Sequence, residues 1–270
     1  MRGRVDLYDE ETKLLVARIF EDPEQRSIVW AGEFGGRILI HVRCAALLRF
    51  NEEQTAFEIF SKTAHYGHCA STSSENWLAM PDFEDSTSRI KLWRNPKDDE
   101  CSQVLSSTGA ENWMPICIHL REELKAVFIG WDSGCIDRVD AETSQQLARI
   151  SLGAEPIFSM VATSRRLFCS TSAPPIRVLD VAEAGLKSCE QQIDYAASAN
   201  GCSCLSLSPS GKTVYASFWD GTVRAYTTGK HGILFSIQAC AYDTVHTICS
   251  PRDRQLYTGD AEGMVKMWRF

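Results

Sequence analysis

The chain alternates apolar and polar residues in short runs, which is the pattern of half-buried β-strands, and it nowhere sustains a helical period. Seven runs are alike, because each alternates and closes on a bulky residue. They are Val5-Asp6-Leu7-Tyr8, Leu47-Leu48-Arg49-Phe50, Ile90-Lys91-Leu92-Trp93, Ile136-Asp137-Arg138-Val139, Ile176-Arg177-Val178-Leu179, Val223-Arg224-Ala225-Tyr226 and Val265-Lys266-Met267-Trp268. Their final residues, at positions 8, 50, 93, 139, 179, 226 and 268, are therefore 42, 43, 46, 40, 47 and 42 positions apart. This regular spacing predicts an all-β fold built from a repeat.

A period of about 40 to 45 residues, with four strands in each unit, is typical of WD40 β-propeller blades. The clearest unit predicts strands over Cys202–Leu207, Lys212–Ser217, Thr222–Tyr226 and Ile233–Ile237, with Pro/Gly and Asp-Gly turns between them. The fifth unit predicts strands over Ile157–Ala162, Arg166–Ser170, Ile176–Leu179 and Glu190–Tyr195. We therefore expect residues 1–270 to form a single WD40-type β-propeller domain.

The two ends of the repeat array leave the number of blades open. The first unit has only its last two strands, Arg4–Tyr8 and Leu14–Phe20, and the seventh ends at its third strand. A sheet ring hides its edge strands by closure. The array therefore forms either six closed blades, with Leu14–Phe20 completing the last, or seven blades whose first half-blade lies upstream of Met1. The second alternative is favoured, because Gly3 to Tyr8 resembles the inside of a repeat.

Composition narrows the classes of function. A net charge of -7 and a pI near 5.4 argue against nucleic acid as a direct partner. The acidic runs Asp82-Phe83-Glu84-Asp85 and Lys97-Asp98-Asp99-Glu100 are predicted to be solvated loops, with a basic partner as the alternative. No apolar run is long enough to span a membrane, and Met1-Arg2-Gly3-Arg4 leads into a strand rather than a signal peptide. The sequence favours a nuclear or cytoplasmic protein.

The cysteines predict free thiols rather than disulfides or a metal site. There are 11 of them, an odd number, and no C-x-x-C motif occurs. They fall mainly in predicted strands, as buried thiols of a reducing compartment do. Strand alternation places Cys202 and Cys204 on one face, where we expect core packing.

Polar residues of the repeat predict structural hydrogen bonds rather than catalysis. WD40 blades often bury a His, an Asp, a Ser or Thr and a Trp that satisfy one another. His68, Asp220 with Thr222, and Glu262 occupy such positions and are predicted to be structural. No His has a Ser or Cys nucleophile setting, and no phosphate-binding loop occurs. We expect no catalytic residue, no metal and no cofactor.

Aromatic and acidic residues near turns predict a partner-binding surface. Trp131 and Trp219 each precede the acidic residue of a turn between second and third strands, on the propeller face where peptides commonly dock. Tryptophan is a favoured interface anchor. The alternative is that each indole packs on a neighbouring blade. Residues before first strands complete the predicted surface: Trp113, Glu155, Tyr242 and Asp243.

Several segments resemble the guanine nucleotide-binding protein beta-subunit-like protein 1 and ASTRA-associated protein 1 family. They are Ile28-Val29-Trp30 followed by Gly36-Arg37-Ile38-Leu39, Trp77-Leu78-Ala79-Met80-Pro81 followed by Ser88-Arg89-Ile90-Lys91-Leu92, Met114-Pro115-Ile116-Cys117, and Trp219-Asp220. The chain departs from the family at Ala173-Pro174-Pro175 and lacks its opening strands.

The resemblance implies a non-catalytic scaffold that acts beside the co-chaperones of phosphatidylinositol-3-kinase-related kinases, or in fungi within the ASTRA chromatin-remodelling assembly. Two other functions remain open from the sequence. One is a substrate-receptor adaptor of a ubiquitin ligase. The other is a hydrolytic propeller enzyme, for which we find no convergent polar groups.

Overall fold

The computed structural model describes residues 3–106, 113–183, 185–240, 244–260 and 262–270. Apart from two short 3-10 helices, Glu122–Leu124 and Ala197–Ala199, every regular element in these ranges is a β-strand. All paired strands are antiparallel and consecutive in the chain, as a repeated meander requires. The all-β prediction is confirmed.

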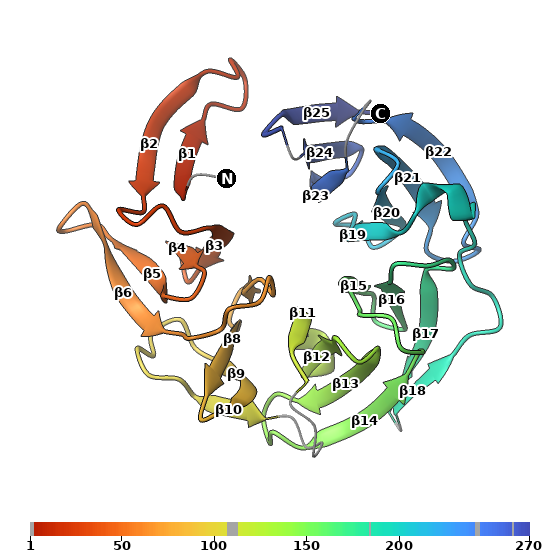
Figure 1. Cartoon of the computed structure of the whole chain (residues 1–270), viewed down its shortest axis with the longest axis horizontal. Helices are drawn as coiled ribbons and strands as arrows, with labels where there is room; N and C mark the ends of the chain where they lie inside the picture. The colour runs from red at the N-terminus through yellow and green to blue at the C-terminus, as the bar shows by residue number, and fades with distance from the viewer. Residues whose placement is uncertain (1–2, 107–112, 184, 241–243, 261) are drawn as a thin grey trace. The chain divides into compact units, whose positions relative to one another are not determined.

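The chain folds as two compact units, Met1–Glu122 and Glu123–Phe270, coloured from red to blue in Figure 1. The first unit contains three sheets and the strand that opens a fourth. Its strands are β1 (Arg4–Tyr8), β2 (Leu15–Glu21), β3 (Ile28–Phe34), β4 (Arg37–Val42), β5 (Ala46–Asn51), β6 (Ala56–Lys62), β7 (Thr72–Ser73), β8 (Leu78–Glu84), β9 (Thr87–Trp93), β10 (Gln103–Ser106) and β11 (Pro115–Arg121). The sheet orders are β1-β2, β3-β4-β5-β6 and β7-β8-β9-β10.

The second unit continues the same order of strands. It contains β12 (Ala126–Trp131), β13 (Cys135–Asp140), β14 (Gln146–Ser151), β15 (Ser159–Ala162), β16 (Arg166–Ser170), β17 (Arg177–Ala182), β18 (Gly185–Ser188), β19 (Cys202–Leu207), β20 (Thr213–Phe218), β21 (Thr222–Thr227), β22 (Ile233–Gln238), β23 (Val245–Arg252), β24 (Gln255–Asp260) and β25 (Val265–Arg269). In chain order, the fourth to seventh sheets are β11-β12-β13-β14, β15-β16-β17-β18, β19-β20-β21-β22 and β23-β24-β25.

Six sheets of the described residues have at least three strands, which agrees with the six-blade alternative rather than with the favoured seven blades. The expectation that Leu14–Phe20 completes the last blade is wrong, because β2 pairs with β1. The two-stranded sheet β1-β2 carries the first of the seven signatures.

Hydrophobic cores lie between neighbouring sheets, and the alternation of the inner strands builds them. On β20, Val214 belongs to a cluster shared with the fifth sheet, whereas its neighbour Tyr215 belongs to a cluster shared with β23 and β24. In the first unit Leu39 and Met80 join the second and third sheets in the same way. Each fully buried aliphatic side chain contributes about 1.5–3 kcal/mol, so an inner strand that supplies side chains to two cores stabilises the sheet on both of its faces.

The fourth strand of the fifth sheet was predicted at Glu190–Tyr195, and that prediction is wrong. The strand β17 runs on to Ala182, and the chain turns back at once into β18, which ends at Ser188. Ile193 and Tyr195 are nevertheless buried, at 1% and 8% exposed, and Ile193 forms only an isolated bridge with Ile176. The apolar alternation there reflects burial of a connecting segment.

A bulge in β19 overturns the expectation that Cys202 and Cys204 share a face. Cys202 pairs with Phe218 and Cys204 with Ser217, so two residues of β19 advance against one residue of β20. Cys202 consequently packs with the fifth sheet and Cys204 toward the seventh. All 11 cysteines are free thiols, as expected.

The first acidic run is not a solvated loop, because Asp82 lies within β8 and its side chain is buried. Its carboxylate pairs with Arg89 Nε and Lys91 Nζ, both at 3.0 Å. These pairs hold the pKa of Asp82 below its usual range, although burial alone raises it. The sequence showed three acidic residues around Phe83, but strand pairing with β9 gives Asp82 two partly buried cationic partners.

We expect Asp82→Ala to lower the free energy of unfolding by about 3 kcal/mol, because it leaves two partly buried cations without their shared carboxylate. Urea unfolding followed by circular dichroism measures the change. Asp98→Ala is the matched control, since Asp98 is exposed in the same unit and should shift stability by less than about 0.5 kcal/mol. Equal effects of the two substitutions would contradict the structural role of Asp82.

Candidate partner-binding site

The turns that hold Trp131 and Trp219 have the same length but place the two indoles differently. Gly134 N donates to Trp131 O at 3.2 Å, and in the sixth sheet the corresponding bond runs from Gly221 N to Phe218 O at 3.1 Å. Trp131 therefore corresponds to Phe218, and Trp219 is one residue further along. A shift of one residue moves a side chain to the other face of the chain. Our assumption that the two tryptophans are equivalent is wrong.

Trp131 ends β12 and is buried, with 1% of its surface exposed. Its indole Nε1 donates to Asp137 Oδ2 at 2.9 Å, and the same carboxylate accepts two hydrogen bonds from Arg149, at 2.6 and 2.7 Å. The Asp137 carboxylate also raises the pKa of Arg149. Trp131 is therefore a packing residue, as in the alternative given above, and it offers no surface to a partner.

Phe218 shows why the equivalent position is buried in the sixth sheet as well. Its ring is fully buried, and the Arg224 guanidinium carbon lies 4.3 Å from the ring centroid. Arg224 also donates to Asp220 Oδ2 at 2.9 Å. In both sheets the last residue of the second strand thus packs beneath a charged pair, Asp137 with Arg149 or Asp220 with Arg224.

Trp219 lies outside this packing and is 37% exposed. One edge of the indole meets Phe158, with ring centroids 5.7 Å apart and planes at 64°. Gly201 lies directly beneath, because a Cβ there would be 2.9 Å from the indole and from Ser172 O, and its φ of +125° also favours glycine. The indole is thus fixed from below while part of its surface faces solvent.

Several connecting segments meet around Trp219. Trp219 N donates to Gly201 O at 3.2 Å, Cys202 N donates to Thr171 O at 3.2 Å, and Ala239 N donates to Gly221 O at 3.0 Å. We call this end of the second unit the Trp219 face, defined by residues 132–134, 152–158, 171–176, 193–201, 219–221, 239–240 and 262–264. Antiparallel meanders place all these connections at one end of their sheets.

The Trp219 face is acidic. Its described residues include five side-chain carboxylates and no Lys or Arg, although Lys266 Nζ donates to Ala239 O from β25; the five are Asp132, Glu155, Asp194, Asp220 and Glu262. Arg224 reaches Asp220 from β21, whereas Glu155 is exposed on the loop that leads to Phe158. The face therefore combines an exposed indole with negative charge.

The remaining predicted surface residues have separate positions. Trp113 lies half-buried in the first unit, just before β11. Glu155 lies on the Trp219 face, as given above. Tyr242 and Asp243 fall outside the described residues. Of the predicted surface residues, the structure thus brings Trp219 and Glu155 to one face.

The predicted structural residues are satisfied only in part. Asp220 Oδ1 accepts hydrogen bonds from Thr222 N and Oγ1, at 2.9 and 2.6 Å, which closes the turn as expected. His68 is exposed, with Nε2 at 3.4 Å from Arg43 Nη1, so it belongs to no buried network. Glu262 is exposed as well.

In the seventh sheet a partly buried hydrogen bond joins an indole to a hydroxyl that the sequence did not point to. Trp268 Nε1 donates to Thr258 Oγ1 at 3.1 Å, and Thr258 is buried. Thr258 and Trp268 stand on the second and third strands, where a repeat of this kind pairs a hydroxyl with an indole. Alignment of the third-strand signatures alone draws attention to Trp268 but not to its partner.

Two buried histidines of the first unit were also missed. His41 and His65 are 0% and 1% exposed, and neither Nε2 has a hydrogen-bond partner. His41 Nδ1 lies 3.0 Å from Ser71 Oγ. Burial lowers the pKa of each imidazole to about 4; for His65 the nearby Asp82 carboxylate opposes that effect. Both rings are therefore neutral at pH 7.

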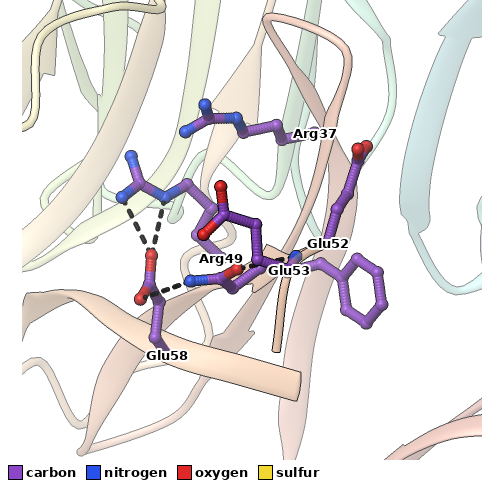
Figure 2. Close-up of a pocket in the computed structure, with 7 residues that line it drawn as sticks. Arg37, Arg49, Glu52, Glu53 and Glu58 are labelled. Carbon is purple, nitrogen blue, oxygen red and sulfur yellow. Dashed lines mark hydrogen bonds and ion pairs between the residues drawn. The ribbon is translucent and has the colours of Figure 1, made fainter. Parts of the chain in front are cut away.

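A pocket of about 280 Å³ in the first unit gathers charged side chains, as Figure 2 shows. Arg49 donates to Glu58 Oε1 from Nε and Nη2, at 3.3 and 2.9 Å, and also pairs with Asp99. Asn51 Nδ2 donates to Glu58 Oε2 at 3.2 Å. Arg37, Glu52 and Glu53, labelled in Figure 2, also line the pocket together with Phe50. The groups at its centre satisfy one another, so this pocket is an ion-pair network rather than a reactive site.

In the described part of the chain, no group of three or more His, Cys, Asp or Glu side chains is arranged to hold a metal ion. Nor does that part contain a helix of the length and apolarity needed to cross a membrane.

Comparison with known proteins establishes the fold. The family model "WD domain, G-beta repeat" matches residues 189–227, which include most of the sixth sheet. No curated protein matches the sequence significantly. One similar solved structure is the Myceliophteria thermophila Cps50 (Swd1) beta-propeller domain, with a TM-score of 0.76 and 14% identity over 100% of this chain and 91% of that chain.

Two further solved structures agree. A chain of the Mitotic Checkpoint Complex has a TM-score of 0.76 and 11% identity, covering 100% of this chain and 82% of that one. The computationally designed Ika8 protein has a TM-score of 0.69 and 13% identity, with coverage of 100% and 91%. The chain therefore has the WD40-type β-propeller fold and contains a WD40 repeat. These comparisons do not support the more specific family resemblance given above.

The two tryptophans should respond differently to substitution. We expect Trp131→Ala to cost about 4 kcal/mol of unfolding free energy, because it empties a buried site and removes a hydrogen bond to Asp137. Trp219→Ala should cost about 1 kcal/mol, since part of that indole is already solvated. Chemical denaturation measures both. A large loss for Trp219 and a small one for Trp131 would reverse their assignment.

The buried histidines predict a loss of stability in acid. Their folded pKa, about 4, lies below the ordinary value of 6.5, so the unfolded chain binds more protons between these values. Stability is fully present above pH 6.5 and should fall by about 3 kcal/mol for each ring as the pH drops through 4. Urea unfolding between these pH values measures the slope.

Replacing His65 with Gln should flatten that slope, because the variant has no imidazole to protonate, whatever its stability at pH 7. Val104→Ala is the control, since Val104 is exposed in the same unit and does not titrate, so the slope should be unchanged. An identical pH dependence in the His65 variant would contradict the assignment.

Proposed function

We propose that this chain is a non-catalytic scaffold that binds proteins or peptide segments at the Trp219 face. WD40 propellers are generally interaction platforms, and the chain has that fold. The observation that carries the proposal is the indole of Trp219, 37% exposed among connecting segments that are acidic and contain no basic residue.

The position of Trp219 suits an interface anchor. Phe158 and Gly201 hold the ring from the side and from below, so little conformational freedom is left to lose on binding. Large aromatic side chains in such settings carry much of the energy of an interface, typically about 2 kcal/mol or more each. The surrounding segments supply polar groups for the rim.

The charge of the face favours a basic partner segment. Glu155 and the other carboxylates of the face produce a negative potential that attracts Lys and Arg side chains. A cation placed over the exposed indole gains a further cation–π attraction of about 0.5–1 kcal/mol. The same negative charge makes direct binding to nucleic acid unfavourable.

The cellular setting is a finer part of the proposal. The segment resemblance supports a role beside co-chaperones of phosphatidylinositol-3-kinase-related kinases, or in an ASTRA-like chromatin-remodelling assembly, in the nucleus or cytoplasm. One of the similar structures is a multi-protein assembly, the Mitotic Checkpoint Complex, in agreement with a scaffold role. Affinity purification from the native cells distinguishes this setting from the alternative. Recovery of cullin-type subunits would favour a ubiquitin-ligase adaptor.

We expect Trp219→Ala to reduce recovery of the bound partners at least about tenfold, because it removes the central anchor. Tagged protein is purified from its own cells, and the recovered proteins are quantified by mass spectrometry. Circular dichroism checks that the variant folds.

Val104→Ala serves as the matched control, because Val104 is an exposed apolar residue of β10 in the first unit. The Val104→Ala variant should recover the bound partners at the wild-type level. If the Trp219 variant also retained them, the Trp219 face would not be the binding surface.

A further inference from the structure

A second concave site lies at the other end of β20. The turn Ser208 to Lys212, the strand β22 and the Asp253-Arg254 turn enclose a groove of about 290 Å³, closed at one side by Phe270. We call it the Phe270 groove. Thr213 begins β20 at this groove, whereas Phe218 ends the strand beside Trp219. A six-residue strand is about 20 Å long, so the two surfaces are separate.

An aromatic row forms the apolar wall of the groove. The ring centroids of Phe235 and Phe270 lie 4.2 Å apart, and those of Tyr215 and Phe235 lie 6.4 Å apart. Leu234 and Phe270 remain 53% and 43% exposed. Ile233, which is 60% exposed, continues the apolar surface along β22. Apolar area of this extent is available for contact with an apolar side chain.

The charged rim of the groove is unbalanced. Lys212 and Arg254 are exposed and form no ion pair with a described residue. Asp253, by contrast, is held by the opposite turn, since its Oδ1 accepts hydrogen bonds from Ser210 N and Oγ at 3.2 and 2.8 Å. Two cations therefore remain for a ligand, and the one acidic side chain of the lining, Asp253, is partly satisfied.

The groove is formed before any ligand binds. Gly211 N donates to Ser208 O at 2.8 Å and Thr213 N to Ser208 Oγ at 3.1 Å, which closes the turn. Thr228 Oγ1 donates to Gly211 O at 2.9 Å, and Phe270 N donates to Arg254 O at 3.0 Å. These bonds fix both sides of the groove, so that little ordering is required on binding.

We propose that the Phe270 groove binds a peptide segment in which an apolar side chain stands next to an acidic one. The volume of about 290 Å³ lies just below the range for small-molecule sites, about 300–1,000 Å³, and fits one or two side chains. The open edge strand β22 lets the rest of an extended segment continue beyond the groove. The apolar side chain contacts Leu234 and Phe270, and the carboxylate reaches Lys212 and Arg254.

A pair of fluorescein-labelled peptides tests this site by fluorescence anisotropy with the full chain. The first has the sequence Gly-Leu-Glu-Phe-Glu-Gly, and the second replaces both Glu by Lys. We expect the acidic peptide to bind at least about tenfold more tightly. Equal binding of the two peptides, or no binding at about 1 mM protein, would overturn the proposal.

Two charge-reversed double variants locate the binding. Lys212→Glu with Arg254→Glu should weaken the acidic peptide at least about tenfold. Lys187→Glu with Arg165→Glu makes the same change of charge at exposed positions outside the groove and should leave affinity unchanged. Circular dichroism confirms that both fold. If both variants weakened binding of the acidic peptide equally, the effect would come from net charge alone, and the proposed site would be wrong.

The proposal is independent of the function proposed for Trp219. Leu234→Ala should weaken the acidic peptide without changing recovery of the partners bound at the Trp219 face. Trp219→Ala should leave the peptide affinity intact. If Trp219→Ala abolished binding of the acidic peptide and Leu234→Ala did not, the peptide would bind at the Trp219 face and not in the Phe270 groove.

Discussion

The register between the second and third strands of each sheet is the constraint on which this structure depends. These inner strands are buried on both faces, so each residue must meet one neighbouring sheet or the other. Val214 and Tyr215 are adjacent in the chain yet belong to different cores. A shift of one residue would exchange these environments along the whole strand. A difference of one position also separates the two tryptophans: Trp131 ends its strand and is buried, whereas Trp219 follows the end of its strand and is exposed.

Much of the fold could be predicted from the sequence, because strand alternation is a local property. The third strands fall where the seven signatures predict, and β19 to β22 were found nearly to the residue. Burial of Asp82 could not be found, since Arg89 and Lys91 reach it only through pairing with β9. The bulge at Cys202 also depends on its partner strand. The apolar residues of 190–195 indicated burial correctly. A buried strand and a buried connecting segment give the same apolar pattern, so the sequence could not tell them apart.

The candidate site follows the same division between local and tertiary information. An aromatic residue near a turn was visible in the sequence, but its exposure depends on the residue at which the strand ends. Counting back from Gly134 and Gly221 places Trp131 three residues before its glycine and Trp219 two, a signal that was available. The acidic character of the Trp219 face and the cations of the Phe270 groove become apparent only when the connections are sorted by the end of β20 at which they lie.

The distribution of thiols gives the folded chain a chemical property of its own. Burial raises the pKa of Cys69, Cys202 and Cys204, so that their reactive thiolate form is suppressed in the native state. Cys44 is exposed at a turn in the first unit, where reagents can reach it without unfolding. Alkylation of an interior cysteine therefore reports local unfolding of the sheets that bury it. Each thiol becomes available to the reagent only when its own core separates.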